Sequence, residues 1–110
     1  MPRQRSTFGK FLASGKAIVI LRDDQVITHA TIGEKAFQVR AHDLGTLTFT
    51  LPQIQSIVYK NLPTYPTDVL RTVGGSEIKG EILTDPIHVR ADGLGGGVTL
   101  AKAKVLSIVF

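Results

Sequence analysis

Apolar and polar residues alternate with a period of two along much of the chain. Residues 77–82 and 87–92 each place apolar or small side chains at every second position, with charged or polar side chains between them. The same rhythm runs through residues 46–51, where threonine alternates with leucine and phenylalanine. A period of two puts one set of side chains on the inner face of a β-strand and leaves the other in water. The pattern therefore predicts an all-β protein.

Two segments, residues 54–59 and 105–110, are apolar at neighbouring as well as at alternate positions. Strands with this composition are typical of sheets that are buried on both faces. We therefore expect the second face of these strands to be covered, either by the other half of the chain or by another subunit.

The two segments belong to a longer series that recurs after about 51 residues. The sequence QSIVY at residues 55–59 matches LSIVF at residues 106–110. The sequence VRA at residues 39–41 recurs at residues 89–91, one residue closer, so one loop is expected to differ in length by a residue. Convergent strand composition can produce one such match but hardly an ordered series. The sequence thus predicts two copies of one β-rich unit.

The predicted organisation has four parts. Pro63 and Pro66 interrupt any strand ladder and favour an extended connection between the copies. A copy of about 50 residues buries only a modest fraction of its surface, so we expect the two copies to pack as a pseudo-symmetric pair. The parts are a basic arm at residues 1–16, a first β unit at residues 17–60, a linker at residues 61–67 and a second β unit at residues 68–110.

The second unit carries the clearer family resemblance. Residues 69–83 contain Ile-x-Gly-x-Ile, and residues 87–110 contain Ile-x-Val, a glycine-rich turn and a closing apolar strand, with a weaker version at residues 17–59. This series resembles the small SH3-like or Sm-like β-barrel, and the resemblance implies two such barrel units. It implies no ligand, because no RNA-binding signature of the Sm family is recognisable and a fold does not dictate function.

Composition narrows the class of protein. The 110 residues include no cysteine, which excludes disulfides and thiolate metal sites. No apolar run approaches the roughly 18 residues that a membrane span needs. We therefore expect a cytoplasmic protein, although a signal peptide removed from a natural precursor is also compatible with the sequence.

The net charge of +4 is concentrated in the N-terminal arm. Residues 1–16 contain four basic side chains and no acid, whereas the other nine basic residues are balanced by nine acids. In residues 6–14 the apolar side chains follow the i, i+3, i+4 spacing of a short amphipathic helix. Basic residues interleaved with phenylalanine suit the phosphates and bases of a nucleic acid, or an anionic membrane surface; the alternative is an ordinary solvated terminus. The candidate contacts in the arm are Arg3, Arg5, Phe8, Lys10, Phe11 and Lys16.

Two further candidates, Arg40 and Arg90, occupy equivalent places in the two units and suit an acidic partner, the alternative being ordinary exposed strand positions. No catalytic, cofactor-binding or metal site is predicted. His42 and Asp43 are neighbours on a predicted strand and point to opposite faces, so they form a poor base and orienting pair. The chain has no Gly-x-Ser-x-Gly elbow, no His-x-x-x-His and no calcium-binding loop.

These observations favour a non-enzymatic binding or assembly module that acts through protein–protein interaction, with a protein partner or with copies of itself. The neutral body and the doubly apolar strands support this hypothesis. A second hypothesis is a nucleic-acid-binding protein that uses the basic arm and a barrel face. A third is an enzyme with a site between the two units, since such a site needs no local motif.

Overall fold

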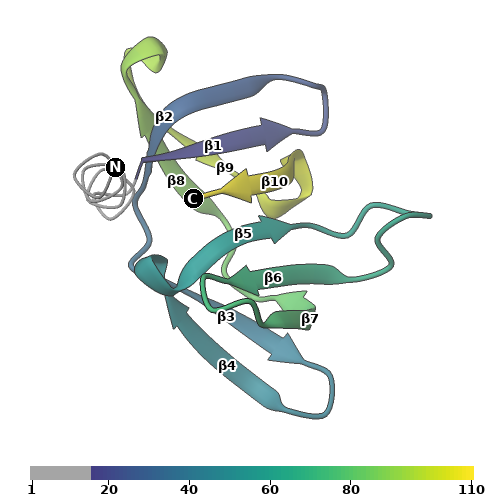
Figure 1. Ribbon diagram of the computed structural model, residues 1–110. Helices are drawn as coiled ribbons and strands as arrows, with labels where there is room; N and C mark the ends of the chain where they lie inside the picture. The colour runs from purple at the N-terminus through teal and green to yellow at the C-terminus, as the bar shows by residue number, and fades with distance from the viewer. Residues whose placement is uncertain (1–15) are drawn as a thin grey trace, which may run out of the picture.

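The computed structural model describes residues 16–110, and it confirms the all-β class. Ten antiparallel strands form one sheet in the order β4-β3-β7-β6-β5-β10-β1-β2-β8-β9 (Figure 1). No helix in the described residues is long and apolar enough to cross a membrane. The strands are β1 (Lys16–Leu21), β2 (Val26–Ile32), β3 (Ala36–Ala41), β4 (Gly45–Thr50), β5 (Ile54–Val58), β6 (Asp68–Thr72), β7 (Glu77–Ile82), β8 (Ile87–Ala91), β9 (Gly96–Leu100) and β10 (Val105–Val109), with short 3-10 helices η1 (Leu51–Gln53), η2 (Asp92–Leu94) and η3 (Lys102–Lys104).

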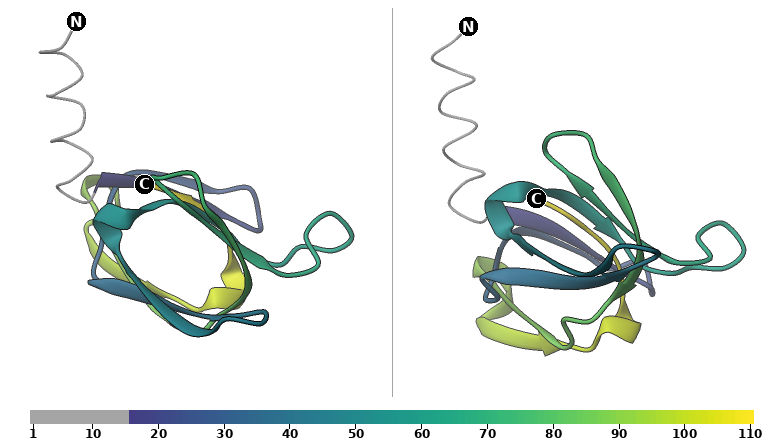
Figure 2. Two further views of the ribbon diagram at one scale, coloured as in Figure 1. Left: turned by 60° about the horizontal axis from the view of Figure 1, so that its bottom comes forward. Right: turned by 90° about the horizontal axis from the view of Figure 1, so that it is seen from below.

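The sheet curls around a single core (Figure 2). Its inner face carries fully buried side chains from both halves of the chain, among them Phe37, Leu70 and Ile82. The alternation in the strands predicts a core that includes Val39, Phe49, Ile57, Val89, Leu100 and Ile108, and of these Val39, Ile57, Val89 and Ile108 are buried. Phe49 and Leu100 are only partly buried because they lie on β4 and β9, the two outermost strands of the sheet.

Strand pairing crosses repeatedly between the two halves of the chain. Strand β10 lies between β1 and β5 and pairs with both (Figure 1). The hairpin β1–β2 is flanked by β10 and β8, and the hairpin β6–β7 is flanked by β5 and β3. Suppose that each strand is exchanged with the strand five places away along the chain, β1 with β6, β2 with β7 and so on. The order of the strands in the sheet is then the same, read in the opposite direction.

Backbone hydrogen bonds outside the ladders also recur in both halves. Arg22 N–H donates to Lys104 O and Val73 N–H donates to Gln53 O, while Tyr59 N–H donates to Leu106 O and Phe110 N–H donates to Gln55 O. Within each pair, corresponding residues lie 51 positions apart in the sequence.

A β-bulge in β2 changes this spacing from 51 to 50 residues. Two residues separate Ile27 from Ala30, whereas one separates Ile78 from Gly80 at the corresponding place in β7. The extra residue is accommodated with His29 in the left-handed region at φ 54°. The one-residue difference that we expected in a loop therefore lies inside a strand.

Residues 61–67, the predicted linker, form a loop that projects from the body (Figure 2). An antiparallel bridge between Asn61 and Tyr65 closes the loop. The loop leads directly into Asp68, the first residue of β6, and so positions the polar cavity described below.

Candidate functional site

Apolar side chains occupy the outward side of the central strands. Ile18 on β1, Val26 on β2 and Val109 on β10 are exposed by 41%, 56% and 42%. Val19 on β1 and Ile108 on β10 point inward and are fully buried, so β1 and β10 are apolar on both faces. We call the outward set the outer face; its members are Ile18, Ile20, Val26, Val58, Val69 and Val109.

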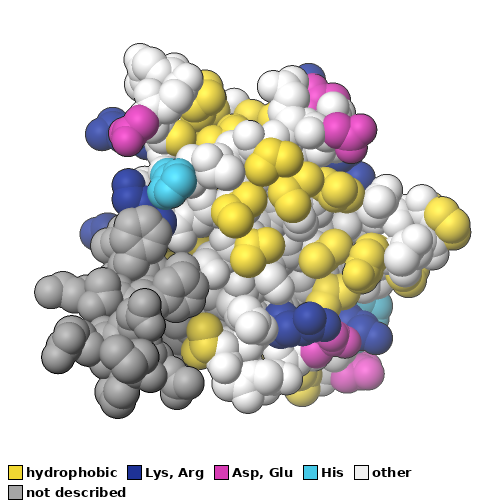
Figure 3. Space-filling view, turned by 45° about the horizontal axis from the view of Figure 1, so that its top comes forward, with side chains coloured by type: hydrophobic (Ala, Val, Ile, Leu, Met, Phe, Trp, Pro, Cys, Tyr) yellow, Lys and Arg dark blue, Asp and Glu magenta, His cyan; other side chains and the backbone are white. Residues whose placement is uncertain are grey.

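The register of the strands aligns the outer face in two rows. One row runs Val26, Ile20, Ser107, Val58, Val69 across β2, β1, β10, β5 and β6. The other runs Ile18, Val109, Ser56, Arg71 across β1, β10, β5 and β6. Apolar side chains gather in the middle of this surface, with charged groups towards its margins (Figure 3). The centre of the outer face is therefore uncharged and mostly apolar, with Ser107 and Ser56 between the apolar side chains.

The projecting loop forms a wall at one end of the outer face. Tyr65 and Pro66 line a groove of about 220 Å³ whose floor includes Val58 and Val69. Arg71 donates a hydrogen bond of 2.6 Å to Glu77 at the rim, and this bond holds the pKa of the Glu77 carboxyl below its usual value.

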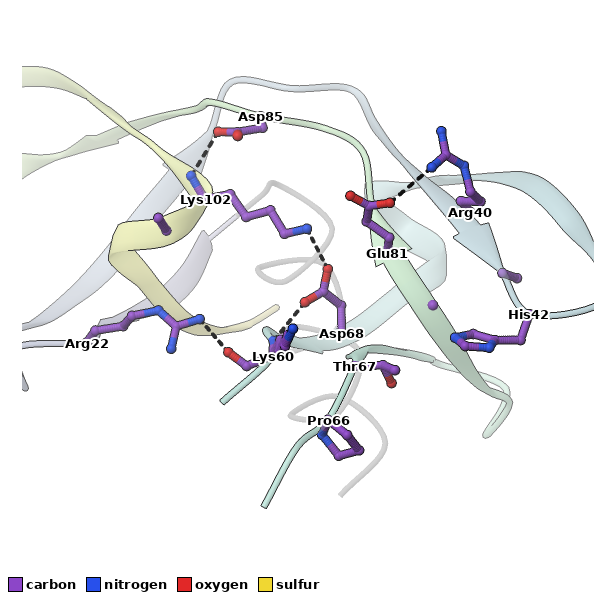
Figure 4. A pocket seen from close by; sticks show the side chains of 13 residues that line it. Arg22, Arg40, His42, Lys60, Pro66, Thr67, Asp68, Glu81, Asp85 and Lys102 are labelled. Atoms are coloured by element: carbon purple, nitrogen blue, oxygen red, sulfur yellow. Dashed lines mark hydrogen bonds and ion pairs between the residues drawn. The ribbon is translucent and has the colours of Figure 1, made fainter. Parts of the chain in front are cut away.

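A larger hollow, the polar cavity, adjoins this groove at the projecting loop, where Pro66 and Thr67 line both. Its volume is about 610 Å³, and its lining combines the loop, β3, β6, β7 and η3 (Figure 4). The charged side chains in the lining are Arg22, Arg40, Lys60, Lys102, Asp68, Glu81 and Asp85.

Asp68 is the buried centre of the polar cavity, with 3% of its surface exposed. Its carboxylate accepts the backbone N–H groups of Lys60 and Ile82, both at 2.7 Å. The Lys102 ammonium lies 2.7 Å from the same carboxylate and also donates to Ile82 O at 2.9 Å. Two amides and one ammonium satisfy this buried charge, as a buried carboxylate requires.

The corresponding positions in the other half of the chain are apolar. Ala17 pairs with Ala30 where Asp68 pairs with Gly80, and Leu51 begins η1 where Lys102 begins η3. An alanine and a leucine thus stand in place of the ion pair. Sequence patterns did not reveal Asp68 and Lys102 as site residues, although aligning the two halves does show this exchange of polar for apolar residues.

The side chain of Tyr59 is fully buried in the core. Its hydroxyl has no hydrogen-bond partner in the described part of the protein. Burial, and secondarily the negative charges of Asp68, Asp85 and Glu34, raise the pKa of this phenol well above its usual value.

The candidates from the sequence are not brought together. Arg40 lines the polar cavity and pairs with Glu81 at 3.1 Å, whereas Arg90 is exposed on β8. Lys16 begins β1 and is partly buried. The other arm candidates, Arg3, Arg5, Phe8, Lys10 and Phe11, and the helix expected there, lie outside the described residues.

The histidines are also separate from one another. His42 lines the polar cavity, His88 Nδ1 lies 2.6 Å from the Glu34 carboxylate, and His29 is in the β2 bulge. Among residues 16–110, no group of three histidine, aspartate or glutamate side chains is placed to hold a metal ion.

Comparisons with protein-family models, curated proteins and solved structures give no match to this chain.

Proposed function

We propose that this protein is a non-enzymatic assembly module that associates with a second copy of itself through the outer face. The observation that carries the proposal is the set of outward apolar side chains on adjacent central strands. Contiguous apolar patches on a soluble domain commonly mark interaction sites. Burying this face against another sheet would remove the patch from water, with the two sheets about 10 Å apart.

Charge supports a second copy as the occupant. The rows of the outer face contain one charged residue, Arg71, and its charge is offset by Glu77. Two such faces therefore meet without a strong like-charge repulsion. In a two-fold dimer this patch meets its own copy in the other subunit, so a face that carries little charge suits both sides of the interface.

We further propose that the chain is a duplicated five-strand unit in which the two copies exchange their N-terminal hairpins. In this arrangement β1–β2 completes a barrel-like half with β8, β9 and β10, and β6–β7 completes the other with β3, β4 and β5. The recurring hydrogen bonds and the reversible strand order support the proposal.

The association is tested by the mass of the protein in solution. Sedimentation velocity at micromolar concentrations should give a dimer, and Val109→Lys should give a folded monomer because it places a charge in the centre of the apolar face. Val73→Lys is the matched control, since Val73 is an exposed valine in the β6–β7 turn, outside the outer face.

A monomeric wild-type protein at high concentration would exclude self-association. A Val109→Lys variant that remains dimeric would place the interface elsewhere. The nucleic-acid hypothesis has its own test. Labelled single-stranded RNA should bind the intact chain at low salt, and binding should weaken as salt is added and be lost when the basic arm, residues 1–16, is deleted.

A further inference from the structure

We propose that the polar cavity binds a small anion that carries a carboxylate or phosphate group, held by Arg22, Lys60 and Lys102. The three binding residues are not members of the outer face, although Pro66 and Thr67 of the projecting loop line both the polar cavity and the groove at the end of the outer face. Its volume of about 610 Å³ lies within the range of small-molecule sites in proteins.

The charge balance of the cavity favours an anion. Four cationic and three anionic side chains line it. Glu81 is paired with Arg40, and Asp68 is paired with Lys102. Among the described residues, no carboxylate pairs with Arg22 or Lys60, so two cations remain against Asp85 alone.

Two of the three side chains that would contact the anion, Arg22 and Lys102, are held in place by hydrogen bonds. Arg22 Nη2 donates to Lys60 O at 2.6 Å, which directs the guanidinium across the cavity towards Lys60 (Figure 4). Asp68 anchors the Lys102 ammonium, while Asp85 Oδ1 accepts the Lys102 backbone N–H at 2.8 Å. Because an ammonium has three donors and Lys102 uses two, one donor is left for a ligand.

The contrast between the two halves argues against a purely structural ion pair. Ala17 and Leu51 occupy the corresponding places, so this fold accommodates an apolar pair there. A buried ion pair is often no more stabilising than apolar side chains of similar volume, because both charges lose their hydration. We infer that Asp68 and Lys102 serve the cavity, with Asp68 as a positioning residue for the Lys102 ammonium.

The proposal is tested by NMR titration of the labelled full-length protein with inorganic phosphate and, separately, with succinate, at constant ionic strength. Glycerol is the uncharged comparator. Backbone amides at Lys60, Asp85 and Lys102 should shift and saturate with phosphate, succinate or both, and the responding probe identifies the anionic group. Shifts that never saturate with either anion, or that glycerol reproduces, overturn the proposal.

Two single substitutions test whether the anion binds in the polar cavity. Lys60→Ala should raise the dissociation constant about tenfold or more, as loss of a charge-assisted hydrogen bond does. Lys104→Ala is the matched control, because Lys104 is an exposed lysine of η3 outside the cavity lining, and it should leave the constant within about twofold. Equal effects of the two substitutions would mean nonspecific attraction to surface charge and would overturn the site.

A second variant separates binding from folding. The double substitution Asp68→Asn with Lys102→Met removes both charges while keeping side chains of similar size. It should remain folded by circular dichroism and lose anion binding by about tenfold or more; undiminished binding would overturn the role of Lys102. Because Lys60 is not a member of the outer face and Val109 does not line the polar cavity, Lys60→Ala should leave the mass in solution unchanged and Val109→Lys should leave the anion affinity unchanged.

Discussion

The burial of Tyr59 combines a favourable aromatic ring with an unfavourable hydroxyl group. Its ring fills the core, yet its hydroxyl is buried without a hydrogen-bond partner in the described residues. Phe110 stands at the corresponding place in the other half and packs edge-on against Phe37, with ring centroids 6.2 Å apart. The position therefore accepts a ring without a hydroxyl.

We predict that Tyr59→Phe leaves the free energy of unfolding unchanged or raises it by as much as about 3 kcal/mol. The substitution removes a hydroxyl group that loses its hydration on folding and gains no hydrogen bond in return. Urea unfolding monitored by circular dichroism measures the effect. A loss of more than about 1 kcal/mol would instead mean that the hydroxyl has a partner of its own.

The raised pKa of Tyr59 also makes the stability of the protein depend on pH. The pKa of Tyr59 is higher in the folded protein than in the unfolded chain, where it is about 10. Below that value both states keep the proton and the full contribution to stability is present. As the pH rises above it, the unfolded chain loses the proton first, so stability falls. The decline should be shallower in Tyr59→Phe than in the wild type when unfolding is measured between pH 9 and 11.

Alternation along the strands predicted which apolar side chains point inward better than it predicted the burial of charged ones. Alternation marks Val39 and Ile108 as inward, and both are fully buried. Asp68 follows a proline-containing loop and reads as a solvated residue, yet it is buried. Only the fold supplies its two amides and the ammonium of Lys102, which comes from a turn 34 positions away.

At the scale of strands, Gly80 determines how far β7 can pair with β3. A Cβ atom at this position would overlap the carbonyl oxygen of Arg40 and lie 2.9 Å from Ala41 Cα. Three residue pairs join β3 to β7, whereas two join β2 to β8, where Ala30 replaces the glycine. The missing side chain thus permits the closer and longer pairing.

Gly80→Ala should accordingly destabilise the protein by about 1–3 kcal/mol, since backbone rather than a flexible side chain must move. Gly93→Ala is the control, because a Cβ there meets nothing within 4 Å, and its effect should stay within about 0.5 kcal/mol. Chemical denaturation of both variants provides the measurement. Equal stability would show that β3 and β7 do not approach as closely as described.

The strands themselves were largely predictable, whereas their partners were not. A period of two assigns residues 77–82 and 87–92 to strands, which matches β7 and β8 except for Asp92 in η2, and it assigns the inward faces correctly. It carries no information about which strand lies alongside, because the backbone groups that pair are the same at every residue. The sequence therefore predicts neither the pairing of β10 with both β1 and β5 nor the bulge at His29, and both are known only from the structure.

At the scale of the whole molecule, the two halves hold each other together. Five strand ladders join β1–β5 to β6–β10: β1–β10, β5–β10, β5–β6, β3–β7 and β2–β8. Within each half the ladders form only two separate hairpins. Isolated hairpins are at best marginally stable in water.

We predict that cutting the projecting loop leaves the fold intact. A protease site inserted between Pro63 and Thr64, which are exposed, should be cleaved without separating the fragments in native buffer. Size-exclusion chromatography should show one complex that dissociates in urea. Each fragment purified in urea and returned to buffer alone at low concentration should lack a cooperative unfolding transition; a folded monomeric fragment would instead mean that the halves are independent domains.

The central position of β10 also bears on how the chain is made. Its first residue follows the last residue of β5 by 47 positions, which a ribosome adding roughly 5–20 residues per second covers in about 2–9 seconds. Throughout that interval β1 and β5 each keep an unpaired edge that a neighbouring nascent chain can bind. The strand synthesised latest among the ten thus protects the emerging protein from aggregation, and slower translation would prolong the exposure.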